Sequence, residues 1–391
     1  MSDAKRLIST IETLQGRYMD GDLSRRGFLQ GLFAVGLSAT AVSMIMSSSG
    51  ARAETGEAVE ILWDGKPFDA GGESVTICHW GGEMQDMAYD GIIKQFEADY
   101  NCRVVYDAAY PWFPKMSTAG PDNPPIDLYG GNLPESLNLE AQGYFVSHAD
   151  LKANVPAVND MVEEIAFYGP GVIWGLHVMG LAYRTDTVVP PPTSLADLFD
   201  KTYENTRAIY VPINDLQAIL FMSIAQTFGA DQYDKQAALD KLQEGMPWIT
   251  SPFTGETMNL MERGEVVLAW QTDGEALLQK ERGLPINWVQ AKEVAPFNVM
   301  HKAVSKGSSP MKKKLAYALL DRYCSPEAGT MWSEALYFHP VNPKAVMAPK
   351  MAELGYTGTS SDLTSLYRPD WKWYIENQQE IIDATNTILA G

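Results

Sequence analysis

Short apolar runs alternate with amphipathic segments along most of the chain, a pattern typical of strands followed by helices. Residues 75–80 form a mostly apolar run that predicts a buried strand, and Gly81 and Gly82 follow it as a turn. Residues 84–100 then predict a helix whose inward face carries apolar residues at helical spacing: Met87, Ile92, Ile93 and Phe96. This order of strand, glycine turn and helix predicts an α/β fold.

The alternation continues through the rest of the chain. Further strands are predicted at residues 102–106, 126–131, 208–211, 266–270 and 294–299. Further helices are predicted to begin near Pro134, Leu195, Asp215, Lys314 and Pro326. Strands that alternate with helices in this way form mainly parallel sheets with helices on both faces.

Residues 169–183 are too apolar and too rich in glycine for a surface loop, and they predict one long strand that crosses between two domains. Three prolines at 190–192 end this passage, and a second α/β region begins after them. We therefore predict three parts in the mature chain: an irregular lead-in at 54–72, a first lobe at 73–178 plus 296–345, and a second lobe at 179–295 plus 346–391.

The N-terminal region predicts export from the cytoplasm. Arg25 and Arg26 stand just before an apolar run at 27–46, and residues 51–53 form a small-x-small cleavage sequence. These features predict a twin-arginine signal peptide at 1–53 and a mature chain that begins near Glu54. A retained membrane anchor is the alternative, because a run of this length is barely long enough to span a bilayer. No cysteine for a lipid anchor lies near the cleavage site, so we expect a freely soluble protein in the periplasm.

The net charge of the mature chain limits the kinds of molecule that it can bind. Six of the 30 basic and four of the 49 acidic residues precede residue 54, so the mature chain carries a net charge of −21. This charge disfavours nucleic acid and anionic lipid, and it fits a cationic solute, a basic partner or simply an acidic soluble surface.

The cysteine content does not indicate a disulfide framework. The chain has an odd number of cysteines and no CxxC motif, so Cys78, Cys102 and Cys324 are predicted to be packing thiols.

Catalytic motifs are missing from the sequence. None of the five histidines forms an HxxxH pair, and there is no HExxH, GxSxG, P-loop or GxGxxG sequence. Ser309 and Lys312 match an SxxK pattern, but a match of this kind is expected by chance in a chain this long. The sequence therefore disfavours an enzyme and predicts no metal site and no cofactor.

Three predicted strands end instead in an aromatic residue followed by small or amide residues. The three sequences are Trp80-Gly81-Gly82, Tyr129-Gly130-Gly131-Asn132 and Trp270-Gln271-Thr272-Asp273. Ligands of open α/β sheets bind beyond the carboxyl ends of strands, near the N-termini of the following helices. Because these strand ends come from both predicted lobes, they predict a ligand-binding cleft between the lobes.

In the order and spacing of its segments the chain resembles the extracellular solute-binding proteins of ABC importers, specifically the branch that includes spermidine- and putrescine-binding proteins. The likeness covers nearly all of the mature sequence and rests on Trp80-Gly81-Gly82 with Phe96-Glu97, Trp174-Gly175 with residues 180–183, residues 195–198, and residues 318–328. The resemblance implies a two-lobed periplasmic-binding-protein fold of the type II kind, joined by crossing hinge strands. It also implies a monomer without catalysis that closes on its solute and meets an inner-membrane ABC permease with its cytoplasmic ATPase. During export the partner would be the twin-arginine translocase.

Polyamine-binding members of this branch hold ammonium groups with carboxylates and enclose the methylenes between aromatic rings. By the resemblance, Asp215 stands at an amine-binding acid, whereas Ala218 and Asn298 replace two other expected acids and Pro296 replaces an aromatic residue. The ligand-binding residues that we predict are Trp80, Gly82, Gln85, Gly131, Asn132, Asp215, Trp270, Gln271, Asp273, Asn298, Tyr337, Phe338 and His339.

The missing acids put a di- or triamine in doubt. They favour a smaller monoamine, or a zwitterion whose anionic end sits on the helix N-terminus after Gly81 and Gly82. A polyamine-like solute, an anionic solute and a ferric ion stay open as alternatives, and so does an exported enzyme that is loaded with a cofactor before export.

Overall fold

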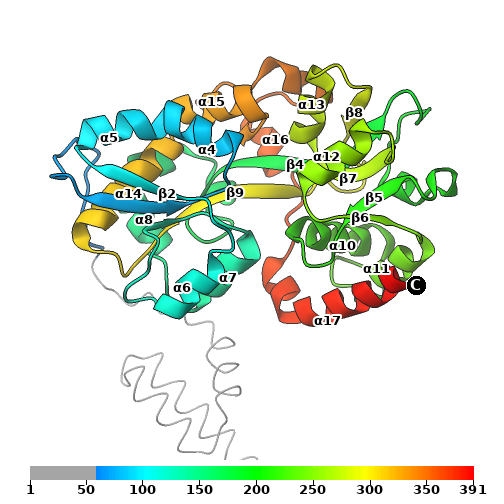
Figure 1. Cartoon of the computed structure of the whole chain (residues 1–391), viewed down its shortest axis with the longest axis horizontal. Helices are drawn as coiled ribbons and strands as arrows, with labels where there is room; N and C mark the ends of the chain where they lie inside the picture. Colours follow the sequence, from blue (N-terminus) through cyan, green and yellow to red (C-terminus); the bar gives the residue numbers. More distant parts are fainter. Residues whose placement is uncertain (1–58) are drawn as a thin grey trace, which may run out of the picture. The chain divides into compact units, whose positions relative to one another are not determined.

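The computed structural model describes residues 59–391, and the elements named below lie in one compact unit, Ile61–Gly391. Figure 1 shows two lobes, each a sheet flanked by helices, joined by two long strands that run from one lobe into the other. The two-lobed α/β fold predicted from the sequence is confirmed. The predicted signal peptide lies outside the described residues.

The strands form one continuous path in the order β2-β1-β3-β9-β4-β7-β5-β6, with β8 and β10 paired to β4. In the first lobe, β1 is parallel to both β2 and β3, and β9 runs antiparallel to β3. In the second lobe, β5 is parallel to both β6 and β7. The strand bounds are β1 Ser74–Cys78, β2 Arg103–Asp107, β3 Leu128–Tyr129, β4 Val172–Arg184, β5 Arg207–Tyr210, β6 Ile249–Ser251, β7 Leu268–Thr272, β8 Ile286–Val289, β9 Phe297–Val304 and β10 His339–Pro340.

Helices connect these strands and cover their faces (Figure 1). Those of the first half of the chain are α4 Glu83–Ala88, α5 Lys94–Tyr100, α6 Phe113–Ala119, α7 Leu133–Ala141, α8 His148–Asn154 and α9 Glu163–Ala166. Those of the second half are α10 Asp215–Phe228, α11 Lys235–Glu244, α12 Thr254–Glu262, α13 Asp273–Glu281, α14 Pro310–Tyr323, α15 Pro326–Leu336, α16 Ser360–Thr364 and α17 Trp371–Ala390.

The long strand β4 serves both lobes, as its apolar sequence predicts. Its first half pairs with β9 and β10, and its second half pairs with β7 and β8. The chain enters β4 through Gly171, whose φ of +68° and contact with β9 both require glycine. A Cβ atom there would lie 2.1 Å from the backbone oxygen of Lys302. The predicted residue boundaries of the two lobes stay a prediction.

Two predicted helices differ in detail from the structure. The helix expected at 84–100 contains a π-helical turn, Tyr89–Ile93, between α4 and α5. At Gly91 in that turn a Cβ atom would lie 2.1 Å from the sulfur of Met331, so α15 packs closely on this segment. The helix expected to start at Leu195 is a single 3-10 turn, Leu195–Phe199. Local pattern located both segments, but neighbouring packing decided their helical type.

The cysteines behave as packing thiols, as predicted. Cys78, Cys102 and Cys324 are all free. Within residues 59–391 no helix is long and apolar enough to cross a membrane. Over the same residues no group of three or more His, Cys, Asp or Glu side chains is arranged to hold a metal ion.

Candidate functional site

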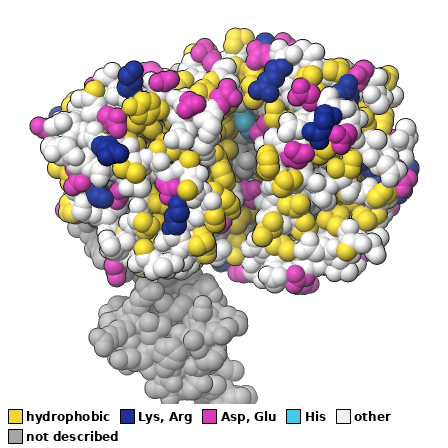
Figure 2. Space-filling view, in the orientation of Figure 1, with side chains coloured by type: hydrophobic (Ala, Val, Ile, Leu, Met, Phe, Trp, Pro, Cys, Tyr) yellow, Lys and Arg dark blue, Asp and Glu magenta, His cyan; other side chains and the backbone are white. Residues whose placement is uncertain are grey.

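A groove runs between the two lobes, and hydrophobic side chains line much of its walls (Figure 2). The carboxyl ends of β1 and β3 lie at one edge of the first sheet, because neighbouring strands in a parallel arrangement point the same way. In the second lobe β5 and β7 are related in the same manner. The loops and helix starts that follow these strands are therefore the parts of each lobe that can build a shared site.

Three aromatic rings pack together at this edge of the first lobe. The ring centroids are 5.3 Å apart for Trp80 and Tyr110, 5.1 Å for Trp80 and Trp112, and 5.2 Å for Tyr110 and Trp112. The hydroxyl of Tyr106 donates to the backbone oxygen of Trp80 at 2.8 Å and holds its loop in place. Trp112 is buried, Trp80 is half-buried and Tyr110 is 47% exposed, so the cluster presents part of its aromatic surface outward.

Next to this cluster, Glu135 in the first turn of α7 accepts hydrogen bonds from two phenols. The hydroxyl of Tyr110 donates to Oε1 at 3.0 Å, and that of Tyr129 donates to Oε2 at 3.3 Å. The amide Nδ2 of Asn132 lies 3.5 Å from the Tyr110 oxygen and ties the predicted Asn132 to the same group. Burial raises the pKa of Glu135, and the two phenol hydrogen bonds only partly oppose that effect.

On the second lobe, Asp215 is the first residue of α10. The preceding Asn214 caps the helix, since its Oδ1 accepts the backbone N–H of Leu216 at 2.8 Å. Burial raises the pKa of Asp215 to about 6, although backbone N–H groups at the helix start lower it. The negative charge of Glu135 raises the pKa of Asp215 further. Asp215 is half-buried, so the predicted amine-binding acid is a partly desolvated carboxylate.

Asp215 and Glu135 come from opposite lobes and are close enough for their charges to interact. Burial raises the pKa of Tyr110 to about 12, and the charges of both carboxylates contribute to that rise. Helix α17 packs against α7, and its buried Tyr374 also lies within the electrostatic reach of Asp215. Among residues 59–391, neither carboxylate forms an ion pair with a lysine or arginine, and no basic group acts on either pKa.

Two of the predicted glycines are required by the local geometry. Gly82 stands before α4 with a φ of +66°, a conformation that favours glycine. A Cβ atom on Gly131 would lie 2.8 Å from the hydroxyl oxygen of Tyr129, so glycine leaves room for the phenol that donates to Glu135. Direct contact of these glycines with a ligand stays a prediction.

Trp270 and Gln271, at the end of β7, have no exposed surface. The indole Nε1 of Trp270 donates to the backbone oxygen of Leu216 at 3.2 Å. The side-chain oxygen of Gln271 accepts the Tyr210 hydroxyl at 2.7 Å. In this structure Trp270 therefore fixes the start of α10, which carries Asp215. The sequence predicted Trp270 as a wall of the cleft, but its side chain has no exposed surface to offer a ligand.

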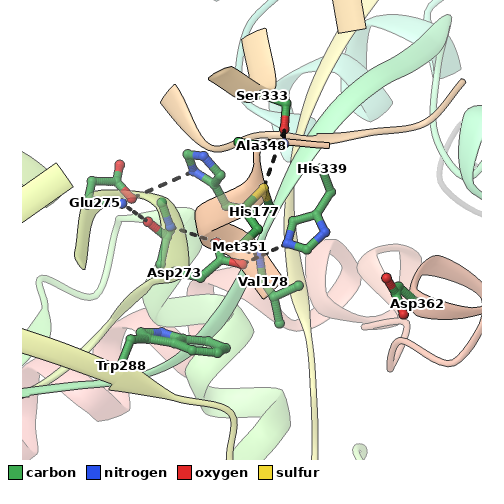
Figure 3. A network of polar contacts seen from close by, with 12 residues as sticks. His177, Val178, Asp273, Glu275, Trp288, Ser333, His339, Ala348, Met351 and Asp362 are labelled. Carbon is green, nitrogen blue, oxygen red and sulfur yellow. Dashed lines mark hydrogen bonds and ion pairs between the residues drawn. The ribbon is translucent and has the colours of Figure 1, made fainter. Parts of the chain in front are cut away.

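Asp273 and His339 are buried in the hinge, where they bind each other (Figure 3). The Oδ2 of Asp273 lies 2.8 Å from Nε2 of His339, and its Oδ1 accepts the backbone N–H groups of Val178 at 3.1 Å and Gly274 at 2.8 Å. Both carboxylate oxygens are thus engaged within the protein. Because Val178 lies on β4 and His339 on β10, which pairs with β4, Asp273 ties the start of α13 to the crossing strand β4 and its neighbour.

Phe338 and Tyr337 also lie in this hinge. The ring of His177 stacks on that of Phe338, with centroids 4.0 Å apart and an angle of 6° between the planes. His177 Nε2 lies 3.0 Å from the backbone oxygen of Leu336, and Nδ1 lies 3.7 Å from Glu275 (Figure 3). Tyr337 ends α15 in the left-handed conformation and is buried. The structure gives these residues a hinge role, while their contact with a ligand stays a prediction.

Two residues that the sequence did not single out, Tyr110 and Glu135, are central to the site geometry. Tyr110 opens an aromatic run after β2, and Glu135 is the third residue of a helix whose preceding strand end had already been assigned to the cleft. These two positions, after a strand end and in the first turn of a helix, are the sequence features that could have pointed to the site. The remaining predicted residues, Gln85 on α4 and Asn298 on β9, are half-buried and have no contact here that tests their predicted role.

Comparisons with known proteins agree with this architecture. The family model of the bacterial extracellular solute-binding proteins matches residues 91–355. A comparison with curated protein sequences gives no match.

Solved structures with the same fold cover most of the chain. An extracellular solute-binding protein from Bordetella parapertussis has 19% identity and a TM-score of 0.69, covering 81% of this chain and 98% of its own. An ABC transporter structure from Clostridium perfringens has 19% identity and a TM-score of 0.66, covering 81% and 99%. The GABA receptor Atu4243 has 16% identity and a TM-score of 0.65, covering 81% and 97%. The family match and these structures show that the chain belongs to the bacterial extracellular solute-binding proteins. These are periplasmic binding proteins, not enzymes, and they deliver small solutes to ABC permeases.

Proposed function

We propose that this protein captures a small solute bearing a positively charged amine in the groove between its lobes and delivers it to its cognate ABC permease. The observation that carries the proposal is the pair Asp215 and Glu135, two half-buried carboxylates on opposite lobes whose pKa values burial raises and which have no basic partner among residues 59–391. A desolvated carboxylate needs a countercharge, and the ammonium group of a solute supplies one. The outward face of Trp80 and Tyr110 adds a surface on which a cation is attracted to aromatic rings.

The helix starts around the groove argue for a cation over an anion. The helices that follow β1, β3, β5 and β7 each carry an acid in the first turn: Glu83 and Asp86 on α4, Glu135 on α7, Asp215 on α10, Asp273 and Glu275 on α13. The short helix α6, which follows the aromatic cluster, carries none. A helix N-terminus attracts an anionic group through its free N–H dipoles, and a carboxylate already placed there cancels that attraction. The anionic solute is therefore the weaker alternative, and so is a zwitterion whose anionic end sits on α4.

Glu135 changes the expected number of amines. The sequence lacked the second acid of the polyamine-binding pattern, whereas the structure supplies an acid from the first lobe. One ammonium held by both carboxylates, or two ammonium groups held by one each, are the arrangements that satisfy both charges. The fold does not choose between ligands, since structures similar to this one include a GABA receptor and a protein with fructose-6-phosphate bound.

The test is a melting-temperature screen on mature protein that has been unfolded and refolded to remove any retained solute. The panel contains polyamines, monoamines, amino acid zwitterions, dicarboxylates, sugar phosphates and ferric ion. A ligand at one hundred times its Kd stabilises the native state by about 2.7 kcal/mol, which gives a readable rise in melting temperature. We expect the melting temperature to rise with amine-bearing compounds only. The variant Asp215→Asn should show no such rise, whereas the control Asp240→Asn, which changes an exposed acid on α11, should keep it. A rise confined to anions or ferric ion would refute the proposed chemistry.

We also propose that the chain leaves the cytoplasm through the twin-arginine translocase and works as a monomer. Arg25 and Arg26 carry the first part of this proposal. Replacing both with lysine should leave unprocessed precursor in the cytoplasm, as seen by immunoblotting of cell fractions. Light scattering of the mature protein should give the mass of one chain.

A further inference from the structure

A second polar cluster lies in the interior of the first lobe, and its centre is Lys302 on β9. Lys302 has no exposed surface and forms no ion pair with a carboxylate among residues 59–391. Its Nζ lies 3.4 Å from the backbone oxygen of Cys78 and 4.6 Å from the centroid of the Tyr323 ring. Burial lowers the pKa of Lys302 to about 8. A buried ammonium with one long hydrogen bond lacks the compensation that buried charges normally have.

Tyr323, whose ring lies beside Lys302, belongs to a group of three large side chains whose polar atoms also lack partners. Trp174, Tyr323 and Trp332 pack on one another, with centroid distances of 5.2 Å for Trp174 and Trp332, 5.6 Å for Trp174 and Tyr323, and 6.5 Å for Tyr323 and Trp332. All three are at most 2% exposed. Within the described chain, the two indole nitrogens and the phenol oxygen have no hydrogen-bond partner. Each indole N–H can only donate, so the cluster holds unused donors.

His79 adds a further donor beside Trp174. Its ring centroid is 6.0 Å from that of Trp174, and its Nδ1 accepts the backbone N–H of Trp80 at 2.9 Å. The proton of the neutral ring is therefore on Nε2. Burial, together with the charge of Lys302, lowers the pKa of His79 well below its ordinary value, so the ring is a neutral donor at neutral pH.

We propose that this cluster, made of Lys302, His79, Trp174, Tyr323 and Trp332, binds a small inorganic anion of the halide class, with chloride as the natural occupant. A buried positive charge with one long hydrogen bond and one ring contact, in a cluster with unused donors, favours an acceptor that carries negative charge. Water would accept some of these hydrogen bonds but would leave the charge of Lys302 unbalanced. Lys302 exposes no surface, so the anion would be buried beneath the carboxyl end of β1 and not exposed in the groove, and the proposal does not depend on the identity of the transported solute.

The position of the cluster gives the anion a structural role at the hinge. Trp174 lies on β4, and its ring contacts that of Phe338 at 5.6 Å. Phe338 in turn stacks on His177. A bound anion would thus join the crossing strand to α14 and α15, which supply Tyr323 and Trp332. Loss of the anion should loosen the first lobe against the hinge and lower stability.

Two measurements on the mature protein test the site. Crystals soaked in bromide should show an anomalous peak within about 3.5 Å of Lys302 Nζ. In solution, chloride titrated against gluconate at constant ionic strength should raise the melting temperature, because gluconate is too large for a buried pocket. Above the Kd, each tenfold increase in chloride should add about 2 °C for a chain of this length. The effect should fade as pH rises past about 8, where Lys302 loses its charge.

Variants separate a specific site from a general salt effect. Lys302→Met should abolish both the bromide peak and the chloride dependence. Trp332→Phe keeps the charge of Lys302 and removes one hydrogen-bond donor, so it should weaken the chloride dependence of the melting temperature. This variant tests the site if Lys302→Met does not fold. Equal melting curves in chloride and gluconate without a bromide peak would overturn the proposal, with water as the occupant. A peak or a chloride effect that survives in Lys302→Met would overturn it as well.

Discussion

Asp215→Asn removes a half-buried negative charge that destabilises the solute-free protein at neutral pH. Burial raises the pKa of Asp215 from 3.8 to about 6, a difference of about two units that corresponds to about 3 kcal/mol. The folded state binds this proton more tightly than the unfolded state, so stability falls as pH rises from about 4 to about 6 and stays low above that range. At pH 7.5 the solute-free variant should therefore be more stable than the natural protein by up to about 3 kcal/mol, and near pH 4 the difference should shrink toward zero.

The same substitution should weaken amine binding strongly. Removing one partner of a buried, hydrogen-bonded charge pair costs about 2 to 5 kcal/mol of binding free energy, which corresponds to a roughly 30- to several-thousand-fold rise in Kd. Urea unfolding at several pH values measures the stability, and calorimetric titration with the best amine from the screen measures the Kd. Asp240→Asn removes an equal charge from an exposed position on α11 and should change neither quantity.

Two results would refute the reasoning. If Asp215→Asn were less stable than the natural protein at neutral pH, the carboxylate would be a structural group rather than a desolvated binding group. If its affinity for the amine were unchanged, Asp215 would lie outside the site. A pH series adds a third check, because the affinity of the natural protein should fall below about pH 6, at most tenfold per unit, and that of the variant should not.

Three further substitutions test the rest of the geometry. Glu135→Gln keeps an acceptor for the phenols but removes the charge, so it should raise the Kd for the amine and stabilise the solute-free protein at neutral pH, as measured by the same titrations and urea curves. Asp273→Asn weakens the bond to His339 and should lower the free energy of unfolding by about 1.5–3 kcal/mol in urea, with the pH profile of amine binding unchanged. Gly274→Ala would place a Cβ atom 2.4 Å from Nε2 of His177 and should lower the unfolding free energy by about 1–3 kcal/mol; a neutral result would mean that the His177 ring moves freely.

Local sequence signals predicted the fold well where one segment decides its own structure. The run at 169–183 is apolar at nearly every position, and it becomes β4, which is buried over almost its whole length in both lobes. Helix α10 begins at Asp215 and ends before Gly229, where the sequence provides a capping asparagine and a glycine. The type of the helical turn at Tyr89–Ile93 escaped prediction because it depends on Met331, which is far away in the sequence.

The candidate site was predicted less completely, because position at a strand end fixes the edge of the sheet but not the direction of a side chain. Trp270 and Asp273 lie at the predicted edge, yet one packs under α10 and the other bonds within the hinge. Tyr110 and Glu135 are 25 residues apart, and only the fold brings the phenol to the carboxylate. A hydrophobic pattern with a period of a few residues contains no information about such a contact.

The pKa directions distinguish the acids of the groove from those of the surface, which the net charge of the chain does not. Lysine or arginine partners lower the pKa values of the surface acids Asp99, Glu163 and Asp186. Asp215 and Glu135 show the opposite shift, because burial disfavours their charged forms and no basic group offsets it. An acidic surface that serves solubility has no reason to desolvate its carboxylates, whereas a site for an ammonium group does, since a cation binds more strongly where water is excluded. The evidence for a cationic solute therefore rests on these two side chains and not on the acidity of the chain as a whole.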